Sequence, residues 1–144
     1  MSGITLAQAR TIIEAARKHG RALGLAPLTV AVLDSGGHPV ALEREDRSGI
    51  LRPEIAFGKA WGALGLGFGS RELFTRSQTA PSFVNAIAMA SQGRLVPVPG
   101  GVLAESASGE ILGAVGISGD LSENDEACAV AGIEAAGLKP RTGA

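Results

Sequence analysis

The sequence has little of several residue types on which common sites and cross-links depend. Its one cysteine, Cys128, excludes an internal disulfide and fits a reducing compartment, so we expect a cytoplasmic protein. With two histidines, His19 and His38, the chain lacks the spaced ligands of a zinc site. Tyrosine is absent and aromatic residues make up 3%, which leaves little surface on which single-stranded nucleic acid could stack.

The sequence also lacks an excess of one charge and any long apolar run. The formal net charge is −1, so we expect no nucleic-acid partner, because such partners attract clusters of Lys and Arg. Apolar stretches are broken well before the roughly 20 residues that cross a bilayer, and residues 1–5 do not resemble a signal peptide. We therefore expect no membrane partner.

Glycine and small apolar residues are abundant instead. The chain has 21 glycines among 144 residues, and 45% of its residues are hydrophobic. This length fits a single domain over residues 1–144 that buries a core. Because glycine has no Cβ, so many glycines predict backbones that approach each other or a ligand closely.

Hydrophobic periodicity and turn residues predict the order helix, hairpin, helices, hairpin, helix. A capping box at Thr5–Gln8 opens the first helix, and Gly24 ends it. The remaining predicted strands are 28–33, 39–44, 102–105 and 110–117. The remaining predicted helices are 54–66, a short one from 70, one over 81–91, and a last helix that Ser122-Glu123-Asn124-Asp125 caps and that ends near Gly137, before a frayed tail, 139–144.

Two hairpins imply an antiparallel sheet, here of four or five strands, whose apolar surface the helices must cover. The predicted fold class is therefore α/β in the α+β sense. Such a sheet leaves edges and an incompletely covered face, so we expect homo-oligomers.

Three side chains have both a chemical and a structural interpretation. His19 lies beside the apolar stripe of the first helix and would serve as an axial ligand, a general base, or a residue at the helix border. His38 follows the Gly36-Gly37 turn, where a solvent-facing position is favoured over a ligand. Cys128 lies among small apolar residues of the last helix and is interpreted as buried rather than nucleophilic.

Two glycine-rich segments differ in what they predict. Gly113–Gly119 runs through a predicted strand without the spacing of a phosphate-binding motif, which indicates close helix-on-sheet packing. Pro97–Gly101 joins stiff prolines to two permissive glycines, and is either a loop whose free N–H groups bind anions or an ordinary turn into a strand. Lys59 lies among apolar residues and either pairs with a ligand carboxylate or extends to solvent.

Taken together, these motifs resemble the GlcG/HbpS-like family, which includes the C-terminal domain of PduO proteins. The resemblance covers nearly the whole chain in order, and each motif alone is weak. The matching segments are Thr5-Leu6-Ala7-Gln8-Ala9, Ala31–His38, Arg44-Glu45-Asp46, Lys59-Ala60, Pro97–Val102, Gly113–Gly119 and Asn124-Asp125-Glu126.

The resemblance implies a profilin-like fold, an antiparallel five-stranded sheet flanked by helices, and oligomers that are often octamers. It also implies haem binding or haem degradation for some members. His19 would match their haem-ligating histidine on the first helix, and Lys59 or Arg44 would pair with the propionates. The family usually has methionine where this chain has Glu45, a charge that would disfavour an apolar porphyrin edge. Haem or another tetrapyrrole is thus the first expected ligand, and otherwise no cofactor.

Two other functions remain open at this point. One is a cofactor-independent enzyme of a catabolic pathway acting on a small unsaturated or amino carboxylate. Lys59 or Arg44 would hold the substrate, and Glu54 or Asp46 would act as acid or base. The Gly100 and Gly101 amides would polarise a carbonyl, with Pro99 beside them in the ligand-binding loop. The other is a non-catalytic sensor or assembly subunit.

Overall fold

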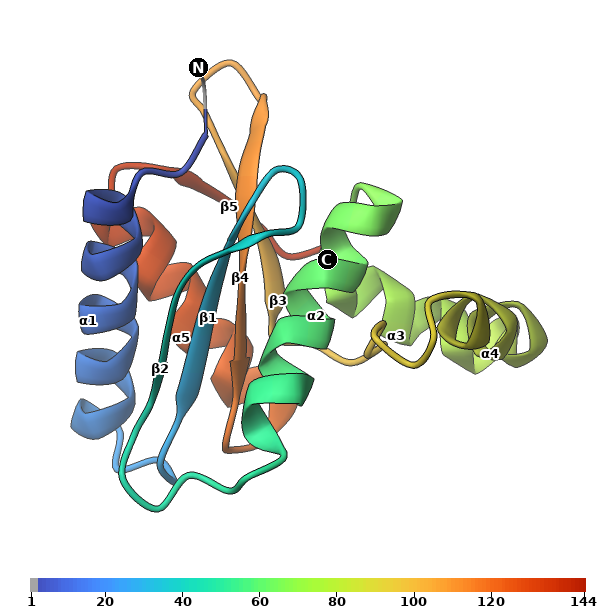
Figure 1. The fold of residues 1–144 in the computed structure, drawn as a ribbon, viewed down its shortest axis with the longest axis horizontal. Coiled ribbons are helices and arrows are strands. Elements are labelled where there is room, and N and C mark those ends of the chain that lie inside the picture. The colour runs from blue at the N-terminus through green and yellow to red at the C-terminus, as the bar shows by residue number, and fades with distance from the viewer. Residues whose placement is uncertain (1–2) are drawn as a thin grey trace.

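The computed structural model describes residues 3–144, which form five helices and five strands (Figure 1). No helix in this range is long and apolar enough to cross a membrane. In chain order the elements are α1 (Leu6–Ala22), β1 (Thr29–Asp34), β2 (Pro39–Arg44), α2 (Arg52–Leu66), α3 (Ser70–Thr79), α4 (Pro81–Ala90), β3 (Gly101–Glu105), β4 (Ile111–Ser118), α5 (Ser122–Ala135) and β5 (Lys139–Arg141).

The strands form one antiparallel sheet in the order β2-β1-β4-β3-β5, with helices on both faces. This confirms the predicted α+β fold and both hairpins, β1–β2 and β3–β4. The hairpins meet at the centre of the sheet, where β1 pairs with β4. The prediction of a frayed tail is wrong for Lys139–Arg141, because these residues pair with β3 and Arg141 forms an ion pair with Glu105.

Helices α1 and α5 cover one face of the sheet and enclose its larger core (Figure 1). Side chains alternate along each strand, so Val30, Val32, Val115 and Ile117 all face this core. The predicted capping box is confirmed, since the Gln8 backbone N–H donates to the Thr5 hydroxyl and the Thr5 N–H donates to the Gln8 side chain.

Helix α2 covers the other face and lies very close to the sheet. Its small core is formed by Leu33, Ala60, Ala63, Leu103 and Ala114. A Cβ placed on Gly116 of β4 would lie 1.9 Å from the Ala56 carbonyl oxygen of α2, so only glycine fits there. This contact supports the interpretation of the Gly113–Gly119 segment as a packing strand.

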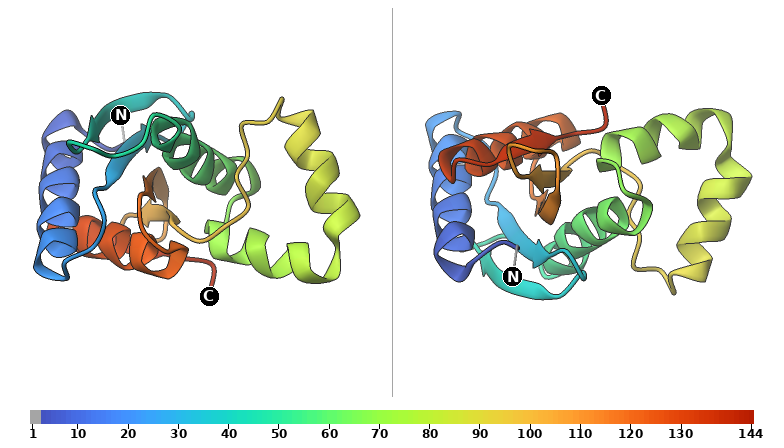
Figure 2. Two further views of the ribbon diagram at one scale, coloured as in Figure 1. Left: turned by 90° about the horizontal axis from the view of Figure 1, so that it is seen from below. Right: turned by 90° about the horizontal axis from the view of Figure 1, so that it is seen from above.

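Helices α3 and α4 form an arm, residues 70–90, that extends away from the sheet and its covering helices (Figure 2). Helix α4 packs against α3 and against no other helix or strand within residues 3–144. The side chains of Phe74, Phe83 and Met89 are 40%, 48% and 80% exposed. The arm therefore presents an apolar surface that this chain does not cover by itself.

Candidate functional site

A buried ion pair joins α2 to the start of α5. The Lys59 Nζ lies 3.2 Å from the Asp125 Oδ2, and the two side chains are 3% and 1% exposed. Nζ also donates to the Ile117 carbonyl oxygen at 2.8 Å, while Asp125 Oδ1 accepts from the Asp120 N–H at 3.0 Å. Lys59 is thus held inside the protein and does not extend to solvent.

Burial opposes the charged forms of both members of this pair. It lowers the pKa of Lys59, with the Asp125 carboxylate acting against this shift and Arg52 adding repulsion. It also raises the pKa of Asp125, against the attraction of Lys59 and the hydrogen bond from Asp120. These contacts indicate a role in fixing α2, β4 and α5 relative to one another.

The loop Pro97–Gly101 lies directly over Lys59. Gly100 has φ of 122°, and a Cβ there would lie 2.9 Å from the Lys59 Nζ. The Gly101 N–H donates to the Ser70 hydroxyl at 2.8 Å, and this hydroxyl donates to the Val98 carbonyl. Pro99 and Gly100 are buried, and the Gly101 amide is already paired with Ser70. In this structure the loop therefore packs on Lys59 and Ser70.

The three residues predicted as acid, base and anchor of a catalytic site are not brought together. Lys59 is buried in its ion pair, Asp46 is exposed in the loop after β2, and Glu54 is exposed on the first turn of α2. Glu54 instead lines a 430 Å³ cavity that also includes Phe57 and Arg94.

At the end of β2, the Arg44 side chain is exposed to solvent, whereas the Glu45 side chain is buried against α1. Arg44 is exposed and donates to the Ser48 carbonyl oxygen at 2.6 Å. The Glu45 side chain is 8% exposed, lies 3.2 Å from Arg17 and 3.5 Å from Arg21, and accepts from the Leu28 N–H at 2.7 Å. The carboxylate that replaces the family's methionine therefore ties α1 to the sheet in this chain.

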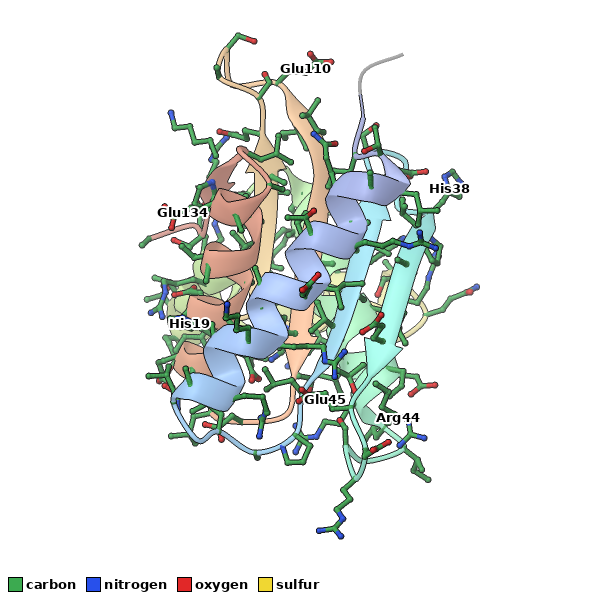
Figure 3. The ribbon with its side chains drawn as sticks, turned by 90° about the vertical axis from the view of Figure 1, so that its left-hand side faces the viewer. His19, His38, Arg44, Glu45, Glu110 and Glu134 are labelled. Atoms are coloured by element: carbon green, nitrogen blue, oxygen red, sulfur yellow. The ribbon has the colours of Figure 1, made fainter. Side chains whose placement is uncertain are left out.

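The two histidines differ in exposure and in the partners of their rings (Figure 3). His19 is half-buried on α1, and its ring has no hydrogen-bond or ion-pair partner among residues 3–144. His38 is 79% exposed at the β1–β2 turn, with its Nδ1 3.3 Å from Asp34 Oδ1. The solvent-facing position predicted for His38 is confirmed, and His19 is the histidine left free.

Cys128 is fully buried, which confirms its prediction as a core residue. Burial raises the pKa of its thiol to about 11, so the nucleophilic thiolate is scarce at neutral pH.

The sequence did not reveal the partners of its candidate residues. It assigns Asp125 to a helix cap, but the N-cap of α5 is Leu121 and no side chain caps that end. A lysine predicted among apolar residues requires a buried carboxylate, which is the signal that would have found Asp125. Arg94 carried no signal, because the turn that places it over α2 depends on tertiary packing.

The protein thus has an α+β fold, and the unpaired His19 on α1 is its candidate ligand-binding histidine. The chain belongs to the HbpS-like family, since the model of haem degrading protein HbpS-like matches residues 4–134.

Known proteins match almost the whole chain, one by sequence and two by solved structure. A 15.0 kDa protein from the dhaT-dhaS intergenic region of Citrobacter freundii is 29% identical over 131 residues, 91% of this chain and 90% of the relative. A Streptomyces reticuli HbpS double mutant has 25% identity and a TM-score of 0.78, covering 93% of this chain and 87% of that one. A PduOC:haem complex has 24% identity and a TM-score of 0.85, covering 94% of this chain and 96% of that one. At this identity the likeness shows a shared fold and nothing more.

Proposed function

We propose that this protein binds haem or a related tetrapyrrole with His19 as an axial ligand to the iron. The observation that supports this most directly is the free imidazole of His19 on α1, in a chain of the HbpS-like family. An axial histidine needs one free ring nitrogen, and both ring nitrogens of His19 are free within residues 3–144. His38 keeps its Nε2 free beside the Nδ1 contact with Asp34, but it lies 79% exposed at the β1–β2 turn and not on α1.

Two exposed cations, Lys18 on α1 and Arg44 at the end of β2, are candidates for contacts with the propionates of a porphyrin. Lys18 precedes His19 on α1, is exposed, and has no ion-pair or hydrogen-bond partner for its side chain among residues 3–144. Arg44 stays a candidate because it is exposed, whereas Lys59 is buried on the other face of the sheet. Lys18 and Arg44 would therefore carry the propionate contacts.

We also infer that the protein forms homo-oligomers. The outer surface of α1 carries an open hollow of 210 Å³, lined by Thr11, Glu14, Ala15 and Lys18, which is small for a porphyrin and does not include His19. A second copy would cover the other side of the ligand. The exposed arm, on the opposite side of the molecule from α1 (Figure 2), offers a separate apolar surface for docking. The octamer, the cytoplasmic location and the catabolic context remain predictions.

Light scattering after size-exclusion chromatography tests the assembly. The wild type is expected to have a mass that is a multiple of 14.5 kDa. The double variant Phe83→Gln with Met89→Gln, which makes the arm more polar, should have a lower mass. A wild type that runs as a monomer at micromolar concentration would contradict it.

Haemin titration tests the ligand. We expect a shifted Soret band in the wild type and in His38→Ala, and its loss in His19→Ala. His38→Ala is the matched control, because it removes the chain's other imidazole from a different surface. An unshifted wild-type spectrum, or an unchanged band in His19→Ala, would rule the mechanism out.

A further inference from the structure

A second cavity lies on the outer side of α2, away from His19. It has a volume of 430 Å³ and is lined by Pro53, Glu54, Phe57, Gln92, Gly93 and Arg94. This volume falls within the roughly 300–1,000 Å³ typical of small-molecule sites. Its walls combine an aromatic ring with one acidic and one basic side chain, which is the composition of a site for a small polar-ended ligand.

The guanidinium of Arg94 is fixed before any ligand arrives. Its Cζ lies 4.1 Å from the centroid of the Trp61 ring, and its Nε donates to the Ser91 carbonyl oxygen at 3.1 Å. The two terminal Nη groups have no hydrogen-bond or ion-pair partner among residues 3–144. Such a group presents free donors to a carboxylate without first giving up an ion pair.

The backbone that carries Arg94 is anchored to α2. The Val96 N–H donates to the Gly58 carbonyl oxygen at 3.2 Å, and a Cβ on Gly58 would lie 2.2 Å from the Arg94 carbonyl oxygen. Gln92, at the rim of the cavity, has φ of 59°, a strained value for a residue with a side chain. The turn is thus held in one shape against α2, which fixes where Arg94 stands relative to Glu54.

Glu54 gives the cavity a second free charge. It lies on the first turn of α2, is exposed, and its side chain has no ion-pair or hydrogen-bond partner among residues 3–144. Phe57 lies one turn further along α2 and lines the same cavity, where it offers a flat apolar surface.

We propose that this cavity binds a small planar carboxylate with an amino or hydroxyl group at its far end. Arg94 takes the carboxylate through its Nη donors, Phe57 contacts the planar body, and Glu54 accepts a hydrogen bond from the far group. Trp61 acts as a positioning residue, because it touches the guanidinium rather than the ligand. This site is independent of the haem proposal and uses none of its residues.

The direct test is calorimetric titration of the full chain with 4-aminobenzoate, benzoate and 4-aminobenzamide. The wild type is expected to bind the two carboxylates, 4-aminobenzoate more tightly, and not the amide. Arg94→Gln should weaken both carboxylates by about tenfold or more, since a charge-assisted contact is lost. Glu54→Gln should leave benzoate binding unchanged and remove the preference for the amino compound.

Arg76→Gln is the matched control, because Arg76 also stacks on an aromatic ring, 4.7 Å from the centroid of Phe68, outside the cavity. It should bind all three probes as the wild type does. Trp61 is the only tryptophan, so its fluorescence gives a second readout: benzoate should change it in the wild type and not in Arg94→Gln. The proposal is overturned if no carboxylate binds at millimolar concentration, or if Arg94→Gln and Arg76→Gln weaken binding equally.

Discussion

Lys59 and Asp125 form an ion pair that is almost completely buried, with 3.2 Å between Nζ and Oδ2. Removing one charge from such a pair leaves the other without compensation inside the protein. We expect Asp125→Asn to lower the free energy of unfolding by about 3–5 kcal/mol, while the amide oxygen still accepts from the Asp120 N–H. Urea unfolding measures this.

The double variant Lys59→Met with Asp125→Asn separates pairing from packing. It removes both charges, so most of the loss should be recovered. A double variant as unstable as the sum of the two single variants would show that the pair does not couple.

The lowered pKa of Lys59 predicts a pH dependence of stability. In the window between its folded pKa and its ordinary value of 10.5, the unfolded chain binds more protons than the folded chain. The free energy of unfolding should therefore rise with pH through that window, because burial penalises the charged form. The stability that deprotonation of Lys59 contributes is complete above pH 10.5 and is lost as pH falls through the folded pKa of Lys59.

Urea unfolding of the wild type and Lys59→Met in that alkaline window checks the sign. The difference in unfolding free energy should shift in favour of the wild type as pH rises. A difference that stays constant would mean that burial does not shift the titration of Lys59.

The close contact between α2 and β4 predicts opposite effects of two glycine substitutions. Gly116→Ala places a Cβ against the Ala56 carbonyl oxygen, which is backbone and cannot turn aside, so we expect a loss of about 1–3 kcal/mol or more. Gly65→Ala in α2 meets no atom within 4 Å and should stabilise by up to about 1 kcal/mol. Thermal unfolding distinguishes them, and equal effects would contradict the packing account.

The sequence allowed prediction of most of the secondary structure, because local signals dominate there. The capping box at Thr5, the Gly36-Gly37 turn and the alternating strands all act over a few residues. Strand β5 was missed because Lys139, Pro140 and Arg141 carry no strand signal of their own and form a strand only through pairing with β3. Its stability comes from tertiary contact and not from propensity.

The site was less predictable, because it depends on contacts between distant segments. Lys59 was singled out correctly as unusual, yet its partner Asp125 is 66 positions away and was assigned to a cap. Arg94 stands over Trp61 through a turn anchored on Gly58, a relation that spacing along the chain does not encode. Glu45 departs from the family pattern, and only the structure showed that Arg17 and Arg21 balance it.

The central claim is that His19 supplies a ring nitrogen to haem iron, and chemical rescue tests it most directly. His19→Gly should lose the haemin Soret shift and regain it when free imidazole is added, since the small molecule then occupies the vacated ligand position. His38→Gly should keep the shift without imidazole. A His19→Gly variant that binds haemin like the wild type, or that imidazole does not restore, would contradict the account.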